Sequence, residues 1–167
     1  VVSKIIAMKI VFWGKGNRGV ACLRALQQAG YAISLVVVHP EDDPLRANSM
    51  AGCAQQFGIP TIAPADPNTP DVGRLLELEN ADLFVLGGYG KILRSPVISI
   101  PTMMCINLHG GKLPRYRGSS PMNWALIGGE TCFTISIIKV DGGIDTGPVL
   151  RERSFPIATS DTIVDLH

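Results

Sequence analysis

An asparagine and a histidine stand two residues apart near the end of a short apolar segment. The run from Met103 to Leu108 is predicted to be a strand, and side chains alternate between the two faces of a strand, so Asn107 and His109 share one face. In parallel sheets the carboxyl ends of the strands open into the ligand-binding crevice. An amide donor and an imidazole projecting together suit a reaction that forms an oxyanion and moves a proton.

The surroundings of His109 favour a functional role over a structural one. A single buried histidine is often only a satisfied core residue, but here Asn107 is its neighbour and the loop that follows is rich in glycine. A basic trio also follows at once: Lys112, Arg115 and Arg117. The stretch from residue 106 to residue 121 is therefore where the chemistry of this chain is most concentrated.

A second polar cluster lies between two predicted strands. The segment from Val140 to Gly147 carries Asp141 and Asp145 together with three glycines. Two carboxylates on such a loop suggest a calcium-like site, but their spacing does not match the EF-hand pattern. Aspartate and glycine are also ordinary turn-forming residues, so a purely structural loop remains an alternative.

A glycine-rich turn follows the first predicted strand. Residues 14–19 satisfy G-x-G-x-x-G directly between a strand and a helix, which places backbone N–H groups where an anion can bind. Dinucleotide binding also requires an acidic residue at the end of the next strand. That strand ends at His39, and Glu41 and Asp42 come late. A tight turn that packs the first helix against the sheet is the preferred interpretation, with an NAD-binding module as the alternative.

Strands and helices alternate through the first half of the chain, which indicates a parallel sheet with helices on both faces. In the second half, two segments alternate polar and apolar residues as antiparallel or edge strands do. We therefore predict an α/β fold of the Rossmann-like, three-layer type with a mostly parallel sheet. The predicted strands are 8–13, 33–38, 61–63, 82–86, 103–108, 132–140 and 149–155, and the predicted helices are 20–30, 47–57, 70–78 and 120–127.

Composition excludes several classes of protein. The 167 residues include 15 lysines and arginines against 14 aspartates and glutamates, and 46% are hydrophobic. This balance gives no support for nucleic acid as the main partner. No apolar run approaches the roughly 18 residues that span a bilayer. The four cysteines form no C-x-x-C pair, so we expect a reduced, cytoplasmic protein without a metal cluster or a membrane segment.

Three stretches together resemble one enzyme family. They are Asn107-Leu108-His109 with Leu113-Pro114-x-Tyr116-Arg117-Gly118, then Gly143-Ile144-Asp145-Thr146-Gly147, and Leu86-Gly87-Gly88-Tyr89-Gly90. In order and spacing they are similar to the N-terminal catalytic domain of the 10-formyltetrahydrofolate-dependent formyltransferases. The resemblance covers nearly the whole chain from Met8. It implies the formyltransferase fold, with residues 1–7 as an extension and residues 8–167 as a catalytic domain whose C-terminal part is missing.

The resemblance implies catalytic roles for three residues, in a reaction in which a primary amine attacks the formyl carbon of 10-formyltetrahydrofolate. His109 would act as the general base and help hold the tetrahedral oxygen. Asn107 would donate a hydrogen bond to that oxyanion, an interaction worth about 3–4 kcal/mol in other enzymes. Asp145 would orient His109 and stabilise its charged form. Neither a metal nor a covalent intermediate is implied.

The resemblance also implies a folate site made largely of main chain. In the family the pterin lies between two loops, which correspond to residues 86–90 and 140–142. The implied cofactor-binding residues are Leu86, Gly88, Tyr89, Val140, Asp141 and Gly142.

Differences between this sequence and the family pattern indicate which amine accepts the formyl group. The tRNA and purine enzymes usually have Ser-Leu-Leu-Pro where this chain has Gly111-Lys112-Leu113-Pro114, and the acidic segment 41–43 replaces a basic insertion of the tRNA enzymes. The segment from Gly118 to Trp124 is more similar to the amino-sugar branch. We therefore favour a nucleotide-linked amino sugar, with Lys112, Arg115 and Arg117 facing its diphosphate.

Several alternatives stay open. Arg117 either binds substrate or fixes its own loop, and Tyr116 and Trp124 either stack on a sugar or base or belong to the core. The acceptor is alternatively methionyl-tRNA, and with water in its place the enzyme would be a formyltetrahydrofolate hydrolase. Outside this class stands the NAD-binding module. The oligomeric state is open, with a dimer as one option.

Overall fold

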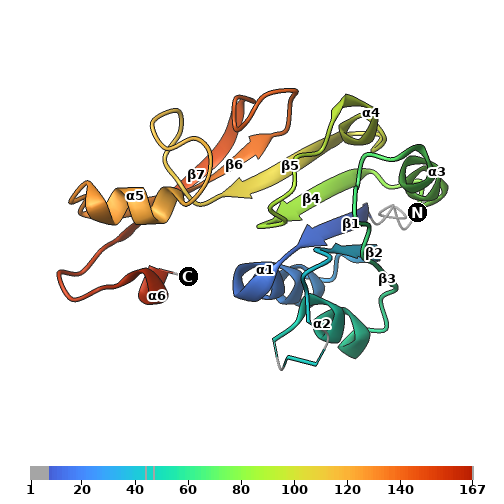
Figure 1. Ribbon diagram of the computed structural model, residues 1–167, viewed down its shortest axis with the longest axis horizontal. Coiled ribbons are helices and arrows are strands. Elements are labelled where there is room, and N and C mark those ends of the chain that lie inside the picture. The colour runs from blue at the N-terminus through green and yellow to red at the C-terminus, as the bar shows by residue number, and fades with distance from the viewer. Residues whose placement is uncertain (1–7, 44, 47, 167) are drawn as a thin grey trace, which may run out of the picture. The chain divides into compact units, whose positions relative to one another are not determined.

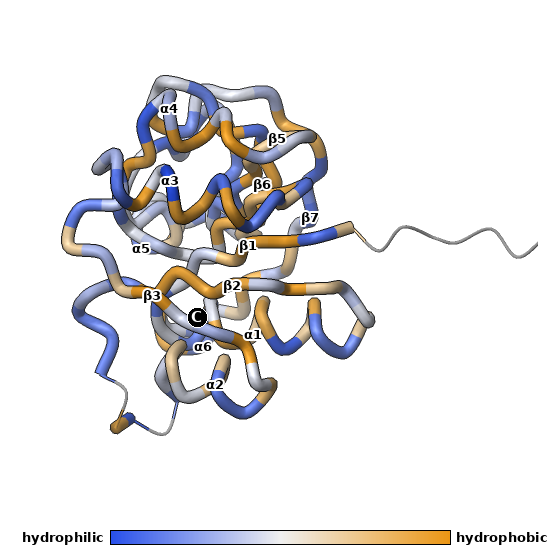
Figure 2. The backbone as a smooth tube through the Cα atoms, turned by 90° about the vertical axis from the view of Figure 1, so that its right-hand side faces the viewer, coloured by the Kyte–Doolittle hydropathy of each residue, from blue (hydrophilic) through white to orange (hydrophobic). Residues whose placement is uncertain are grey.

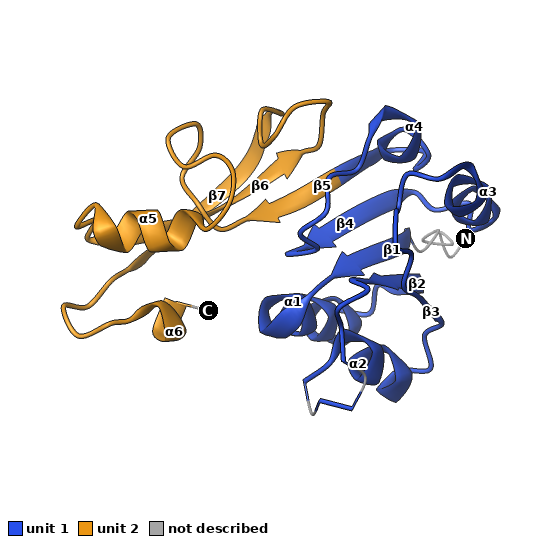
Figure 3. Ribbon diagram, in the orientation of Figure 1, with its two compact units in different colours: residues 1–105 blue, residues 106–167 orange. Residues whose placement is uncertain are grey.

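The computed structural model describes residues 8–43, 45–46 and 48–166. The chain forms two compact units, residues 1–105 and residues 106–167 (Figure 3). The extension predicted for residues 1–7 lies outside the described residues.

Unit 1 is built on four parallel strands, which are labelled in Figure 1. They are β1 (Lys9–Gly14), β2 (Ala32–Val38), β3 (Thr61–Ile62) and β4 (Leu83–Gly87), in the spatial order β3-β2-β1-β4. β1 pairs in parallel with both β2 and β4. Because β1 lies between two neighbours and is covered by helices, its residues from Ile10 to Trp13 are almost completely buried, as expected for a continuous apolar strand.

Helices connect these strands and cover both faces of the sheet. The helices of unit 1 are α1 (Gly16–Gln28), α2 (Met50–Gln56), α3 (Pro70–Leu78) and the short α4 (Ser95–Ile98). Figure 2 shows α1 and α2 on one side of β1 and β2, and α3 on the opposite side. The three layers predicted from the alternation of strands and helices are therefore present in unit 1.

The glycine-rich turn brings α1 close to the sheet. A Cβ atom at Gly19 would lie 2.9 Å from the Gly87 carbonyl oxygen and 2.9 Å from the Met50 sulfur. Lys15, within the turn, binds Glu41 with 2.6 Å between Nζ and Oε2, so that carboxylate is paired with the chain's own ammonium group. These contacts support the packing interpretation of the glycine-rich turn.

Unit 2 is an antiparallel arrangement. It comprises β5 (Met104–His109), whose first two residues belong to unit 1, and α5 (Pro121–Ile127), β6 (Cys132–Lys139), β7 (Val149–Pro156) and α6 (Ile163–Leu166). β6 pairs antiparallel with β5 and with β7. The change from parallel to antiparallel pairing that the alternating sequence predicts is confirmed.

The predicted α/β class is confirmed: helices accompany strands that pair in parallel in unit 1 and antiparallel in unit 2. One helix begins later than predicted: α2 begins at Met50 and not at Ala47, a residue outside the described part of the chain. The Ser49 hydroxyl accepts a hydrogen bond from Gly52 N, and Asp42 accepts from the backbone N–H of Met50 and Ala51. These acceptors satisfy the first N–H groups and fix the helix start.

The close approach at Gly19 predicts a stability effect. Gly19→Ala should lower the free energy of unfolding by about 1–3 kcal/mol, because the new methyl group meets a backbone carbonyl that cannot easily move. Gly73→Ala is the matched control, because a Cβ atom there meets nothing within 4 Å. It lies inside α3 and should gain about 0.5–1 kcal/mol. Urea unfolding of both variants measures the difference, and equal stability would contradict the packing role.

Candidate functional site

The three predicted catalytic side chains all belong to unit 2. Asn107 and His109 lie at the carboxyl end of β5, where they pair with Ile138 and Ser136 of β6. Asp145 lies on the loop between β6 and β7. Antiparallel pairing thus brings residues 36 and 38 positions apart in sequence into direct contact.

The Asp145 carboxylate is the common partner of this group. Its Oδ2 lies 3.3 Å from His109 Nδ1 and accepts the Gly118 backbone N–H at 3.0 Å. Its Oδ1 accepts a hydrogen bond from Asn107 Nδ2 at 3.3 Å. Each carboxylate oxygen therefore has at least one donor, and the three donors come from β5 and from the loop before α5.

The backbone of Asp145 is held in an unusual conformation. Its φ is 51°, in the left-handed region that costs most residues about 1–2 kcal/mol. Arg117 Nε donates to the Asp145 carbonyl oxygen at 3.2 Å, which helps to hold this conformation. The alternative in which Arg117 fixes its own loop therefore has direct structural support.

His109 and Asp145 form a largely buried pair. Their side chains are 6% and 13% exposed. On its other edge His109 Nε2 contacts the Tyr116 carbonyl oxygen. A doubly protonated imidazole ring donates to both of these acceptors, whereas a neutral ring donates to only one. The site thus supplies two partners for an imidazolium away from bulk water.

One N–H of the Asn107 side-chain amide has no partner among the residues that the structure describes. The side-chain amide has two N–H groups, and Asp145 accepts from Nδ2. The second N–H of Asn107 is the group that suits a developing oxyanion, because Asp145 already fixes the orientation of the amide.

Gly111 explains one departure from the family pattern. A Cβ atom at this position would lie 2.7 Å from Pro121 Cβ and 2.9 Å from both Tyr116 Cβ and the Tyr116 carbonyl oxygen. The Gly111 carbonyl also accepts a hydrogen bond from the buried Ser136 hydroxyl at 2.8 Å. A serine side chain at position 111 would therefore require these neighbours to shift.

The loop between β6 and β7 is stabilised by Asp141. This carboxylate accepts hydrogen bonds from the Thr146 hydroxyl at 2.6 Å and from Gly143 N at 3.0 Å. The Thr146 hydrogen bond is the main cause that lowers the pKa of Asp141. The Asp141 side chain thus has the turn-forming role considered from the sequence.

The other predicted cofactor-binding residues lie in unit 1, at and after the end of β4. The side chains of Leu86 and Tyr89 are buried, and Tyr89 packs edge-on against Trp13 with ring centroids 5.1 Å apart. Burial raises the pKa of Tyr89 to about 12. Gly88 has a φ of 74°, a conformation that favours glycine. For this loop, only the main chain is suited to a ligand.

The basic side chains differ in their surroundings. Arg115 forms an ion pair with Glu130 at 2.7 Å and lies over the Tyr116 ring. Glu130 also accepts the Tyr116 hydroxyl at 2.6 Å, which raises the pKa of that tyrosine. Lys112 is exposed, and its carbonyl accepts the Tyr116 N–H.

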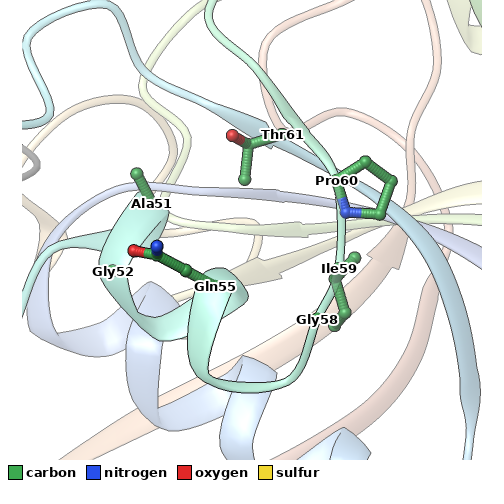
Figure 4. A pocket seen from close by; sticks show the side chains of 7 residues that line it. All are labelled: Ala51, Gly52, Gln55, Gly58, Ile59, Pro60 and Thr61. Carbon is green, nitrogen blue, oxygen red and sulfur yellow. The ribbon is translucent and has the colours of Figure 1, made fainter.

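A separate cavity of about 430 Å³ lies between α2 and the start of β3 (Figure 4). Only Gln55 and Thr61 bring polar side chains to it, so it lacks a group that transfers protons. Within residues 8–43, 45–46 and 48–166, histidines, cysteines and carboxylates form no cluster of metal-site type. In the same part of the chain, every helix is too short or too polar to span a membrane.

The chain belongs to the formyl transferase family, whose family model matches residues 8–167. The methionyl-tRNA formyltransferase of Nitrosomonas eutropha is 38% identical over 165 residues, which cover 96% of this chain and 52% of that protein. The chain spans about half the length of the curated relatives it matches.

Solved structures show the same fold. The formyltetrahydrofolate deformylase of Pseudomonas syringae has a TM-score of 0.80 at 21% identity, covering 97% of this chain and 55% of that one. An N-formyltransferase of Helicobacter canadensis, solved with folinic acid and dTDP-3-aminofucose, has a TM-score of 0.74 at 21% identity, covering 95% and 56%. The predicted formyltransferase fold is therefore confirmed.

Sequence reasoning missed the main-chain groups of the site. The Tyr116 carbonyl and the Gly118 N–H both contact the reactive side chains, and every residue carries such groups, so residue type gives no signal for them. The one available hint was the density of glycine and proline around them.

Gly111 yields a second prediction. Gly111→Ser should lower the free energy of unfolding by about 1–3 kcal/mol, because its side chain meets Tyr116 and Pro121. The displaced Tyr116 carbonyl should also shift the imidazole resonances of His109 in NMR spectra. Gly142→Ser is the stability control, since a Cβ atom there meets nothing within 4 Å. Unchanged stability and unchanged His109 resonances in Gly111→Ser would show that the loop has room for a side chain.

Proposed function

We propose that this protein transfers a formyl group from 10-formyltetrahydrofolate to a primary amine, most suitably that of a nucleotide-linked amino sugar. The observation that carries the proposal is the meeting of an amide, an imidazole and a carboxylate around Asp145. Membership of the formyl transferase family supports the folate-dependent reaction class.

This donor set fits a formyl carbonyl. When bound, 10-formyltetrahydrofolate supplies an activated formyl group to the site. Asn107 is placed to donate its second N–H to the formyl oxygen as negative charge develops there. His109 is placed to accept the proton that the amine loses as the new carbon–nitrogen bond forms. Asp145 acts through His109: it holds the ring and stabilises its charged form.

The Tyr116 carbonyl adds a feature to this assignment. It contacts His109 Nε2, the ring nitrogen that does not face Asp145. The amine must reach this nitrogen, so we infer that acceptor binding displaces the contact. The roles of Leu86, Gly88, Tyr89 and Val140–Gly142 in holding the folate stay predictions.

The choice of acceptor rests on charge near the reactive group. Lys112 and Arg115 are exposed cations on the loop that begins directly after β5, and guanidinium and ammonium groups bind diphosphates. We propose these two side chains as contacts for the diphosphate of the acceptor. Arg117 is also near, but its Nε is occupied by the Asp145 carbonyl.

Methionyl-tRNA is the second candidate acceptor. The relative from Nitrosomonas eutropha that is 38% identical to this chain is a methionyl-tRNA formyltransferase, and this observation favours the tRNA alternative. In both acceptors the primary amine belongs to a group that is joined to a nucleotide: the amino sugar in one case and the methionyl group in the other. The catalytic groups would therefore act alike on either.

The assigned roles predict the behaviour of substitutions. His109→Ala and Asp145→Ala should each lose nearly all turnover while the fold is retained, and Asn107→Ala should lose about 10²–10³-fold, as removal of an oxyanion donor does elsewhere. The measurement is formyl transfer from 10-formyltetrahydrofolate to UDP-, GDP- and dTDP-linked amino sugars and to initiator methionyl-tRNA. Circular dichroism and urea unfolding check the fold.

Asp71→Ala is the matched control, because Asp71 is an exposed carboxylate on α3 that binds only Arg74 among the described residues. It should keep full activity. Reactions without amine test the hydrolase alternative, which predicts formate release in the absence of any acceptor. Near-normal turnover of His109→Ala or Asp145→Ala would refute the assigned catalytic roles.

A further inference from the structure

A groove in unit 2 lies beside the reactive side chains. It encloses about 360 Å³ and is lined by Arg115, Tyr116, Arg117, Trp124, Ile127 and Gly128. Two of these residues also belong to the site described above: the Tyr116 carbonyl contacts His109, and Arg117 donates to the Asp145 carbonyl. The groove therefore begins at the loop that holds the His109–Asp145 pair.

The α5 wall of the groove is aromatic and apolar. Trp124 and Ile127 lie three residues apart and so share one face of the helix. They are 58% and 74% exposed, which shows that Trp124 does not belong to the core. An exposed indole beside an open groove is a stacking surface for a planar ring. Gly128, which has no side chain, also lines this part of the groove.

The groove residues that precede α5 include two arginines, and contacts with Glu130 hold one of them in position. Glu130 binds both the Arg115 guanidinium at 2.7 Å and the Tyr116 hydroxyl at 2.6 Å, and the guanidinium lies over the Tyr116 ring. The Arg115 side chain is nevertheless 68% exposed, so its other N–H donors are available. Arg115 and Arg117 thus bring two guanidinium groups to the groove. Such groups bind phosphate oxygens.

We infer that this groove binds the nucleoside diphosphate part of the acceptor, with the base stacked on Trp124 and the phosphates at Arg115. The inference rests on the proposed function and deepens it, since it makes Trp124 a specificity-determining residue. The volume lies at the low end of the range for small-molecule sites, about 300–1,000 Å³, and suits one nucleoside better than an extended strand.

The test measures nucleotide binding separately from activity. UDP, dTDP, inorganic pyrophosphate and the RNA trinucleotide CCA are titrated into the protein by calorimetry. UDP is also followed by tryptophan fluorescence, which suits this protein because Trp13 is completely buried and Trp124 is exposed. The variants are Trp124→Ala, Trp124→Phe and Arg115→Ala, with Leu150→Ala on β7 as an exposed apolar control.

We expect UDP or dTDP to quench the fluorescence of the wild-type protein. Trp124→Ala should weaken binding of that nucleotide about tenfold or more, and Trp124→Phe should retain most of it, because one stacking ring replaces another. Arg115→Ala should weaken pyrophosphate and nucleotide alike, whereas Trp124→Ala should leave pyrophosphate unchanged. Leu150→Ala should match the wild type.

Two outcomes would overturn the inference. The first is that neither nucleoside diphosphate binds, or that each binds Trp124→Ala as well as the wild type. The second is tighter binding of CCA than of UDP and dTDP, which would assign the groove to an RNA end. The proposed function can fail separately. If no amine is formylated while nucleotide binding still depends on Trp124, the groove is a nucleotide site but the proposed formyl transfer is wrong.

Discussion

The Asp145 carboxylate is the interaction on which the geometry of the site depends. It accepts hydrogen bonds from the Asn107 amide and the Gly118 backbone N–H and faces the His109 ring. These partners come from one strand and one loop, and Asp145 comes from another loop, so this carboxylate ties three segments together. Its left-handed backbone conformation is unfavourable by itself. The contact from Arg117 to its carbonyl helps to maintain it.

Burial strengthens the electrostatic effect of the Asp145 carboxylate on the His109 ring. The pair of His109 and Asp145 is mostly removed from water, so the electrostatic effect of the carboxylate on the ring is less screened than at the surface. The close packing at Gly111 keeps the Tyr116 carbonyl against the other ring edge. The loop after β5 is thus both the support of the imidazole and one wall of the groove.

Patterns of residue type predicted much of the fold and part of the site. Apolar runs located β1, β2 and β4, and the alternation of strands and helices predicted parallel pairing. Because side chains alternate between the two faces of a strand, Asn107 and His109 were predicted to share one face. The role of Asp145 followed only from the resemblance, because an aspartate in a glycine-rich loop is equally a turn former, as Asp141 shows by binding Thr146 and Gly143.

Other features depend on contacts between distant residues and have no signal in the sequence. The start of α2 is set by Asp42 as well as by Ser49, and the exposure of Trp124 depends on what α5 packs against. Main-chain partners such as the Tyr116 carbonyl are invisible to any reasoning from side-chain type. For the same reason, the lack of room at Gly111 becomes visible only when Pro121 and Tyr116 are placed around it.

The state of the His109 ring tests the central claim most directly. Nitrogen-15 NMR of the imidazole, assigned with a His109→Gln variant, reports which ring nitrogens carry protons. We predict that Nδ1 of His109 carries a proton and donates it to Asp145. The Nδ1 resonance should then change clearly in Asp145→Asn. An Nδ1 without a proton in the wild-type protein, or a resonance unaltered by Asp145→Asn, would contradict the account.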